Sequence, residues 1–127
     1  MATVQEALEI ENDSKMLPIS DLTRYLCDHL GRQAAAYIAG LKDTQMLSDW
    51  IAGTEPRTAA KIRVRYAYRA ARMIVETFDD KTAEAWFFGS NSKLDEDAPA
   101  AVLRNAEDVE DLRSLIPAVK AFARAPE

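Results

Sequence analysis

Side chains that could do chemistry are few in this chain of 127 residues, and they lack suitable partners. The single cysteine, Cys27, and the single histidine, His29, come without the further ligands that a metal site requires. His29 has no obvious acid or nucleophile partner in the sequence, and no glycine-rich phosphate-binding loop occurs. The carboxylates of residues 95–97 follow one another directly, a pattern typical of a solvated loop. The sequence therefore predicts a protein that is not an enzyme and has no metal or cofactor.

The distribution of charge directs attention to the middle of the chain. The net charge of −5 combines three unlike segments. Residues 1–31 carry 6 acidic and 2 basic side chains, residues 32–75 carry 3 and 8, and residues 76–127 carry 12 and 6. The protein as a whole should not bind polyanions, but its middle third could.

Nothing in the sequence predicts export or a membrane. No window approaches 18 uninterrupted apolar residues, and the N-terminus lacks the basic and apolar regions of a secretory signal. A lone cysteine cannot form an internal disulfide, which fits a reducing compartment. We therefore expect a cytoplasmic protein, long enough for one domain with its own core.

Apolar residues recur at helical spacing along the chain, and no segment shows the period of two that marks a strand. Residues 1–19 form an acidic leader with only a weak helical pattern. Pro117 should kink or split the last helix near Ser114. We predict an all-α small helical bundle, with helices at residues 21–30, 32–39, 44–52, 58–78, 81–88, 99–104 and 108–123.

Three helix starts have candidate capping residues, since short polar side chains can accept from first-turn N–H groups. They are Ser20 or Asp21, Asp43 or Thr44, and Asp79 or Asp80. The longest helix, residues 58–78, carries two stripes. Its core stripe is Ala60, Val64, Ala67, Ala71, Ile74 and Phe78, and its basic stripe is Lys61, Arg65, Arg69 and Arg72.

Residues 32–53 have the helix lengths and the glycine-containing turn of a helix-turn-helix. In such motifs the exposed face of the second helix enters the major groove. The alternative is a three-helix packing unit whose basic stripe is only solvated. The residues expected to contact DNA are Lys42, Thr44, Gln45 and Ser48, with backbone contacts from Arg57, Lys61 and Arg65.

Three aromatic residues stand together at Trp86, Phe87 and Phe88. Consecutive residues on a helix point about 100° apart, so at least one ring should face away from the core. We expect Trp86 to be buried with its N–H on a carbonyl, and either Phe87 or Phe88 to be exposed or covered by a partner.

The order of motifs in this region resembles the toxin-binding domain of the Xre/MbcA/ParS-type antitoxins. That family shows a tryptophan, apolar partners, an asparagine loop, a leucine, and a proline opening a short leucine-containing helix. It also has a degenerate Xre-like helix-turn-helix upstream, ending in Trp-x-x-Gly. The matching residues cover about residues 20–123 and are Trp50, Gly53, Trp86, Phe88, Asn91, Leu94, Pro99 and Leu103.

One departure from the family's pattern lies in the loop after Leu94. Many members carry a glycine two residues after this leucine, and this chain has Glu96 there. The departure predicts a longer or differently turned loop.

The resemblance implies a protein partner. Members of this family bind RES-domain toxins, which consume NAD⁺, and block the toxin's active site; many also repress their own operon. After the acidic leader (1–19), which lies outside the resemblance, it implies an Xre-like unit with its long helix (20–78) and a toxin-binding domain with a C-terminal tail (79–127). The expected structural residues are Trp50, Trp86, Leu94, Pro99 and Leu103. Toxin contacts are expected from Phe87, Phe88, Asn91, Lys93, Arg104, Lys120, Phe122 and Arg124.

Two functions remain open from the sequence. The first is an antitoxin in a homo-oligomer or in a hetero-oligomer with its toxin, which binds operator DNA as a complex. Its tail, with Lys120 and Arg124, would enter a toxin pocket shaped for dinucleotide phosphates. The alternative is a stand-alone helix-turn-helix DNA-binding transcriptional regulator.

Overall fold

The computed structural model describes residues 3–124, and all regular structure in that part of the chain is helical. The all-α prediction is therefore confirmed. Eight α-helices and two short 3-10 turns follow one another: α1 (Val4–Met16), α2 (Ile19–Leu30), α3 (Arg32–Ala39), α4 (Gln45–Ile51), α5 (Thr58–Thr77), α6 (Asp80–Phe88), η1 (Ser92–Leu94), α7 (Pro99–Asn105), η2 (Val109–Leu112) and α8 (Leu115–Arg124).

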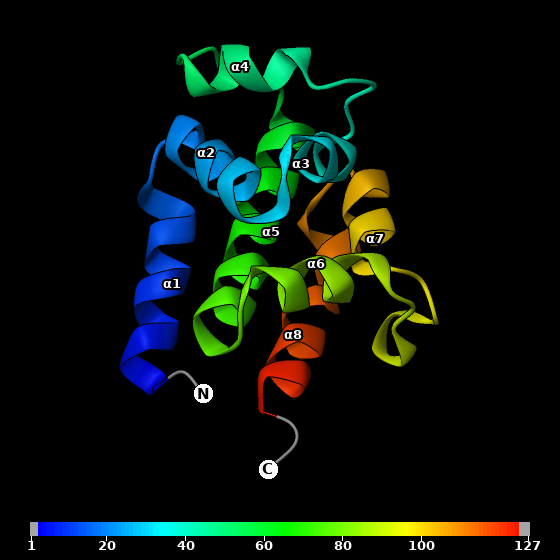
Figure 1. The fold of residues 1–127 in the computed structure, drawn as a ribbon. Coiled ribbons are helices and arrows are strands. Elements are labelled where there is room, and N and C mark those ends of the chain that lie inside the picture. The colour runs from blue at the N-terminus through cyan, green and yellow to red at the C-terminus, as the bar shows by residue number, and fades with distance from the viewer. Residues whose placement is uncertain (1–2, 125–127) are drawn as a thin grey trace.

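Helix α5 runs through the centre of the bundle, with α1 along one side of it, α4 across one end and α8 toward the other end (Figure 1). Alanines at Ala67, Ala70 and Ala71 are fully buried, and their small side chains let the neighbouring helices approach the α5 backbone. The expected core stripe of α5 is buried as far as Ile74. Phe78 is instead 42% exposed, because the helix ends at Thr77 and the backbone of Phe78 leaves it.

The acidic leader forms a complete helix, α1, which is more than its weak apolar pattern predicted. A reciprocal cap begins it: the N–H of Glu6 donates to the Thr3 hydroxyl, and the Thr3 N–H donates to the Glu6 carboxylate. Glu11 and Lys15 form an ion pair one turn apart, 3.0 Å between Oε2 and Nζ. Local interactions thus support a helix whose hydrophobic face is small.

Two capping predictions are confirmed and one is wrong. The Asp43 carboxylate accepts from the N–H of Gln45, and the Asp79 carboxylate accepts from the N–H of Thr82. Helix α2 begins two residues earlier than predicted, at Ile19, and its N-cap Pro18 makes no side-chain cap. Ser20 and Asp21 therefore lie inside the first turn.

Pro117 splits the last helical segment near Ser114, as predicted. Residues 109–112 form the 3-10 turn η2, and Pro117 occupies the first turn of α8, where its missing N–H costs no hydrogen bond. Val109 is exposed and does not belong to the expected apolar stripe, because the 3-10 turn rotates it outward.

Arginines from α5 and α7 hold the turn after α3. Arg63 is buried, and it donates to the carbonyls of Ala39 and Ala106 and to the Glu107 carboxylate. Arg104 donates to the carbonyls of Tyr37 and Leu41. These bonds connect the turn after α3 to the C-terminal half of the chain.

Candidate protein-binding site

The three aromatic residues at the end of α6 point in different directions, as helical phase requires. Trp86 is 7% exposed, Phe87 0% and Phe88 45%. Phe88 is therefore the exposed ring. The expectation that Phe87 contacts a toxin is wrong for this structure, because no part of its ring reaches the surface.

Trp86 packs edge to face on Phe87, with 5.2 Å between ring centroids, and lies 6.3 Å from the ring of Phe122 on α8. Its indole N–H is buried without a hydrogen-bond partner among the described residues. The expectation of a carbonyl acceptor for this N–H is therefore wrong. The indole holds its place through apolar packing.

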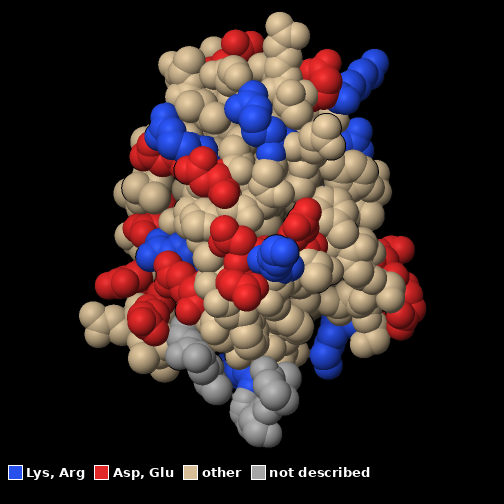
Figure 2. Space-filling model, viewed as in Figure 1, with Lys and Arg blue, Asp and Glu red and all other residues tan. Residues whose placement is uncertain are grey.

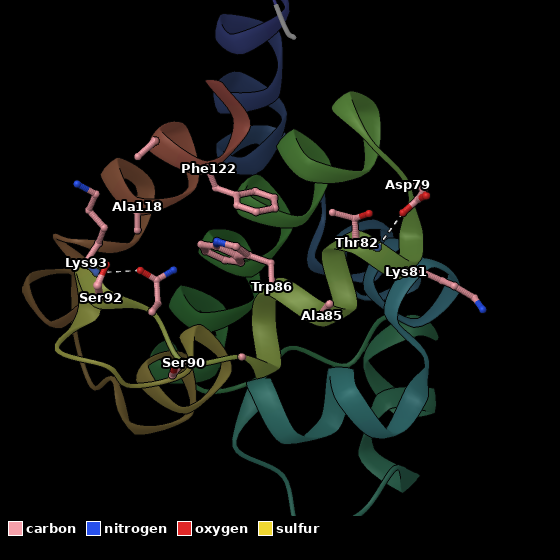
Figure 3. Close-up of a pocket in the computed structure, with 13 residues that line it drawn as sticks. Asp79, Lys81, Thr82, Ala85, Trp86, Ser90, Ser92, Lys93, Ala118 and Phe122 are labelled. Carbon is pink, nitrogen blue, oxygen red and sulfur yellow. Dashed lines mark hydrogen bonds between the residues drawn. The ribbon is translucent and has the colours of Figure 1, made fainter. Parts of the chain in front are cut away.

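An open groove of about 700 Å³ lies beside Trp86, between α6, the loop of residues 89–93 and α8 (Figure 3). Trp86 and Phe122 supply aromatic surface (Figure 3). Lys81 and Lys93 lie at its edge with their ammonium groups pointing away from the two rings, and neither forms an ion pair in the described structure. The lining also has one acidic residue, Asp79, and is otherwise small or polar: Thr82, Ala85, Gly89, Ser90, Asn91, Ser92, Ala118 and Ala121. Apolar surface with basic side chains suits a protein segment that carries apolar and acidic residues.

The loop that closes one end of the groove is fixed by Asn91 and Leu94. The side-chain oxygen of Asn91 accepts from the N–H of Lys93. The backbone carbonyl of Asn91 accepts from the N–H groups of Leu94 and Glu96. Leu94 is buried and anchors the loop to the core. Asn91 and Lys93 are therefore brought to the groove together.

Glu96 has a φ of 69°, and the preceding Asp95 has a φ of 57°. This left-handed region favours glycine, because a β-carbon crowds the backbone there. Glu96 thus adopts the conformation that a glycine at this position would readily take. The expectation of a longer or differently turned loop stays a prediction.

Phe88 belongs to a separate cluster that faces α3. Its ring lies 5.9 Å from that of Tyr37, and the Arg104 guanidinium lies 4.6 Å above the Tyr37 ring. Tyr37 is also exposed. The sequence did not predict its place in this cluster, because no pattern in α3 indicates that the helix contacts α6 and α7. Phe88 and Arg104 are neighbours, but they do not line the groove beside Trp86.

Lys120 and Arg124 line a smaller groove, of about 280 Å³, between α1 and α8. Val4, Leu8 and Glu11 of α1 form its opposite wall. The predicted contact residues are therefore divided among three places. The part of the tail beyond Arg124 lies outside the described residues.

The residues expected to contact DNA are also only partly brought together. Lys42 and Gln45 are exposed at the start of α4, with Thr44 half-buried between them. The Ser48 hydroxyl accepts from Arg32, 2.8 Å away, so it already has a partner. Arg57 is exposed, Lys61 pairs with Glu55 at 2.9 Å, and Trp50 is buried.

Arg65 is not available for phosphates in this structure. Its guanidinium donates to the carbonyls of Ser14 and Leu17 at the end of α1, both at 3.0 Å. The expectation that Arg65 contacts DNA is therefore wrong while α1 covers it. The sequence gave no sign of this pairing, because 48 or more residues separate the partners.

The surroundings of Cys27 and His29 favour a structural role for both side chains. Burial raises the pKa of the Cys27 thiol, which opposes reactivity. His29 Nδ1 lies 2.8 Å from Asp80 Oδ1, and this contact connects α2 to the start of α6. Within residues 3–124 no three histidine, cysteine or carboxylate side chains gather as metal ligands would.

No family model, curated protein or solved structure matches this chain. None of the helices described between residues 3 and 124 is both long and apolar enough to cross a lipid bilayer. The groove and the exposed aromatic cluster are therefore interpreted from their own chemistry.

Proposed function

We propose that this chain is an antitoxin that binds a RES-domain, NAD⁺-degrading toxin through the groove between α6 and α8. The observation that carries the proposal is the groove itself, which combines aromatic surface from Trp86 and Phe122 with the basic side chains of Lys81 and Lys93. Aromatic surface in a concave groove suits a protein segment, and lysines at the rim favour an acidic one through charge complementarity.

The family resemblance supplies the class of partner. The residues that carry it have structural roles consistent with a rigid platform: Trp86, Leu94, Pro99 and Leu103 are all buried. The glycine-favouring turn at Glu96 supports the same assignment. In this proposal these residues shape the platform, and the toxin touches Asn91, Lys93 and Phe122 in the groove, with Phe88 at a second contact.

Stand-alone DNA regulation is the weaker candidate. The exposed start of α4 favours it, but Lys61 and Arg65 are engaged within the chain. Autorepression of an operon is a property that the proposed toxin complex could have in addition.

Co-expression tests the proposal. Expressed with the product of its neighbouring gene, the full chain should elute in a stable complex and preserve cellular NAD⁺. A chain that elutes alone and shifts its own promoter DNA would instead support the regulator.

The contribution of Lys120 and Arg124 needs point substitutions. Removing residues 117–127 would also remove Ala118 and Val119, which are core residues, so loss of protection would be ambiguous. Lys120→Ala and Arg124→Ala leave that core in place. If both variants protect NAD⁺ as fully as the original chain, these cations do not enter the toxin.

A further inference from the structure

Helix α1 is attached to the bundle by few apolar contacts. Ile10 is its one fully buried apolar side chain among the described residues. Val4, Leu8 and Met16 are 79%, 61% and 72% exposed. A helix of 13 residues is marginal in isolation, so α1 depends on what it touches.

What α1 touches is the basic stripe of α5. Asp13 Oδ2 lies 2.6 Å from Arg72 Nη1, and Glu11 Oε1 lies 3.6 Å from Arg69 Nη2. Ser14 in the last turn of α1 and its C-cap residue Leu17 also present carbonyls to Arg65. Basic and acidic residues are interleaved on the face that carries α1 (Figure 2). The helix thus pairs Arg69 and Arg72 with carboxylates and holds Arg65 through backbone carbonyls.

The stripe extends beyond α1 in two directions. Toward α4 it continues to Lys61 and to Arg57, which precedes the first turn of α5. Toward α8 it meets Lys120 and Arg124 in the smaller groove. With α1 removed, two ion pairs of the stripe would remain among the described residues: Lys61 with Glu55, and Arg72 with Glu76. The uncovered surface would be strongly basic over the length of α5.

We propose that α1 is a detachable acidic cover, and that the α5 surface beneath it binds the phosphate backbone of duplex DNA when α1 lifts. Arginine forks recognise phosphate with the same paired geometry that they offer to carboxylates. DNA phosphates therefore compete directly with Glu11 and Asp13 for Arg69 and Arg72. The position of Arg57 and Lys61 beside the α3–α4 unit favours a duplex as the partner. This proposal does not depend on the toxin.

Salt has opposite effects on the lifting of α1 and on the binding of DNA. The α1 ion pairs are partly exposed, so salt weakens them and favours lifting. Binding of DNA releases counterions, so salt opposes it. The cover is therefore tested by substitutions that are compared with a control at each salt concentration, so that both chains experience the same screening.

The test compares Glu11→Gln/Asp13→Asn with a control that removes the same charge elsewhere. Asp28→Asn/Glu84→Gln is suitable, because both side chains are exposed, neither lies on α1 and neither forms an ion pair in the described structure. Affinity of the full-length chains for a fluorescent 30-bp duplex of arbitrary sequence is measured from low to moderate NaCl. Circular dichroism verifies that each variant remains helical.

The Glu11→Gln/Asp13→Asn variant should bind the duplex at least about 10-fold more tightly than the control. Its plot of log affinity against log salt should be steeper by about 2 to 3, since each additional phosphate contact contributes about 0.9. Adding Arg69→Ala and Arg72→Ala should abolish the gain. Equal affinity in variant and control would overturn the proposal. A gain that poly-glutamate displaces as well as DNA does would also overturn it.

Hydrogen exchange of the unaltered chain gives an independent measurement that needs no variant. Amides of α1 should lose protection as NaCl rises from 50 to 500 mM, while amides of α5 keep theirs. If α1 remains as protected as α5 at every salt concentration, the helix does not lift, and the proposal is wrong.

Discussion

The guanidinium of Arg63 fills the space that a β-carbon on Gly40 would need. Gly40 ends α3 with a φ of 89°, and Arg63 donates to the carbonyl of the residue before it. The turn after α3 and the C-terminal half therefore meet at one buried arginine. Both the backbone conformation and the close approach require glycine.

We predict that Gly40→Ala destabilises the fold by about 2 kcal/mol or more, since left-handed strain adds to the displacement of Arg63. Urea unfolding measures the loss. In an Arg63→Ala background the same substitution should cost less, because only the backbone strain remains. Equal costs in both backgrounds would mean that the contact with Arg63 is unimportant.

The two phenylalanines at the aromatic corner should behave oppositely. Phe87→Ala removes a fully buried ring and should cost about 3–5 kcal/mol of stability. Phe88→Ala should change stability by less than about 1 kcal/mol, because its ring is half exposed. Thermal unfolding measures the stability loss of each variant. A larger loss for Phe88→Ala than for Phe87→Ala would show that the burial of the two rings is wrong.

Glu96→Gly should stabilise the chain by about 1 kcal/mol, because glycine relieves the left-handed strain at this residue. Asp97→Gly is the matched control, since Asp97 does not have a positive φ. It should be neutral or destabilising through the added freedom of the unfolded chain. Chemical denaturation distinguishes them, and equal effects would exclude strain at Glu96.

Acid should release α1 before the rest of the bundle. The hydrogen bond from Lys15 and the charge of Arg69 lower the pKa of Glu11 below its usual 4.5. A depressed pKa contributes stability that is present above pH 4.5 and is lost as pH falls through the folded value. NMR chemical shifts of α1 amides should therefore change below pH 4.5 toward those of a less ordered helix, while those of α5 stay constant. In Glu11→Gln this selective change should be weaker.

Much of the fold could be predicted from the sequence, because apolar spacing and glycine and proline positions act locally. The split at Pro117 and the outward ring among Trp86, Phe87 and Phe88 followed from such rules. The cover of α1 over Arg65 and Arg72 could not be predicted, because it joins residues far apart in the chain. The same holds for the groove, which needs α6 and α8 side by side.

The most direct test of the proposed function is to fill the groove and measure toxin binding. Ala121 is exposed on α8 and lines the groove, so Ala121→Trp blocks it without altering the core. Gln45→Trp places the same side chain on exposed α4, at the other end of α5 (Figure 1). Affinity for the RES-domain partner is measured by calorimetry for both variants and the original chain. We predict a loss of at least about 10-fold, or 1.4 kcal/mol, for Ala121→Trp and none for Gln45→Trp. Unchanged affinity of Ala121→Trp would contradict docking at this groove.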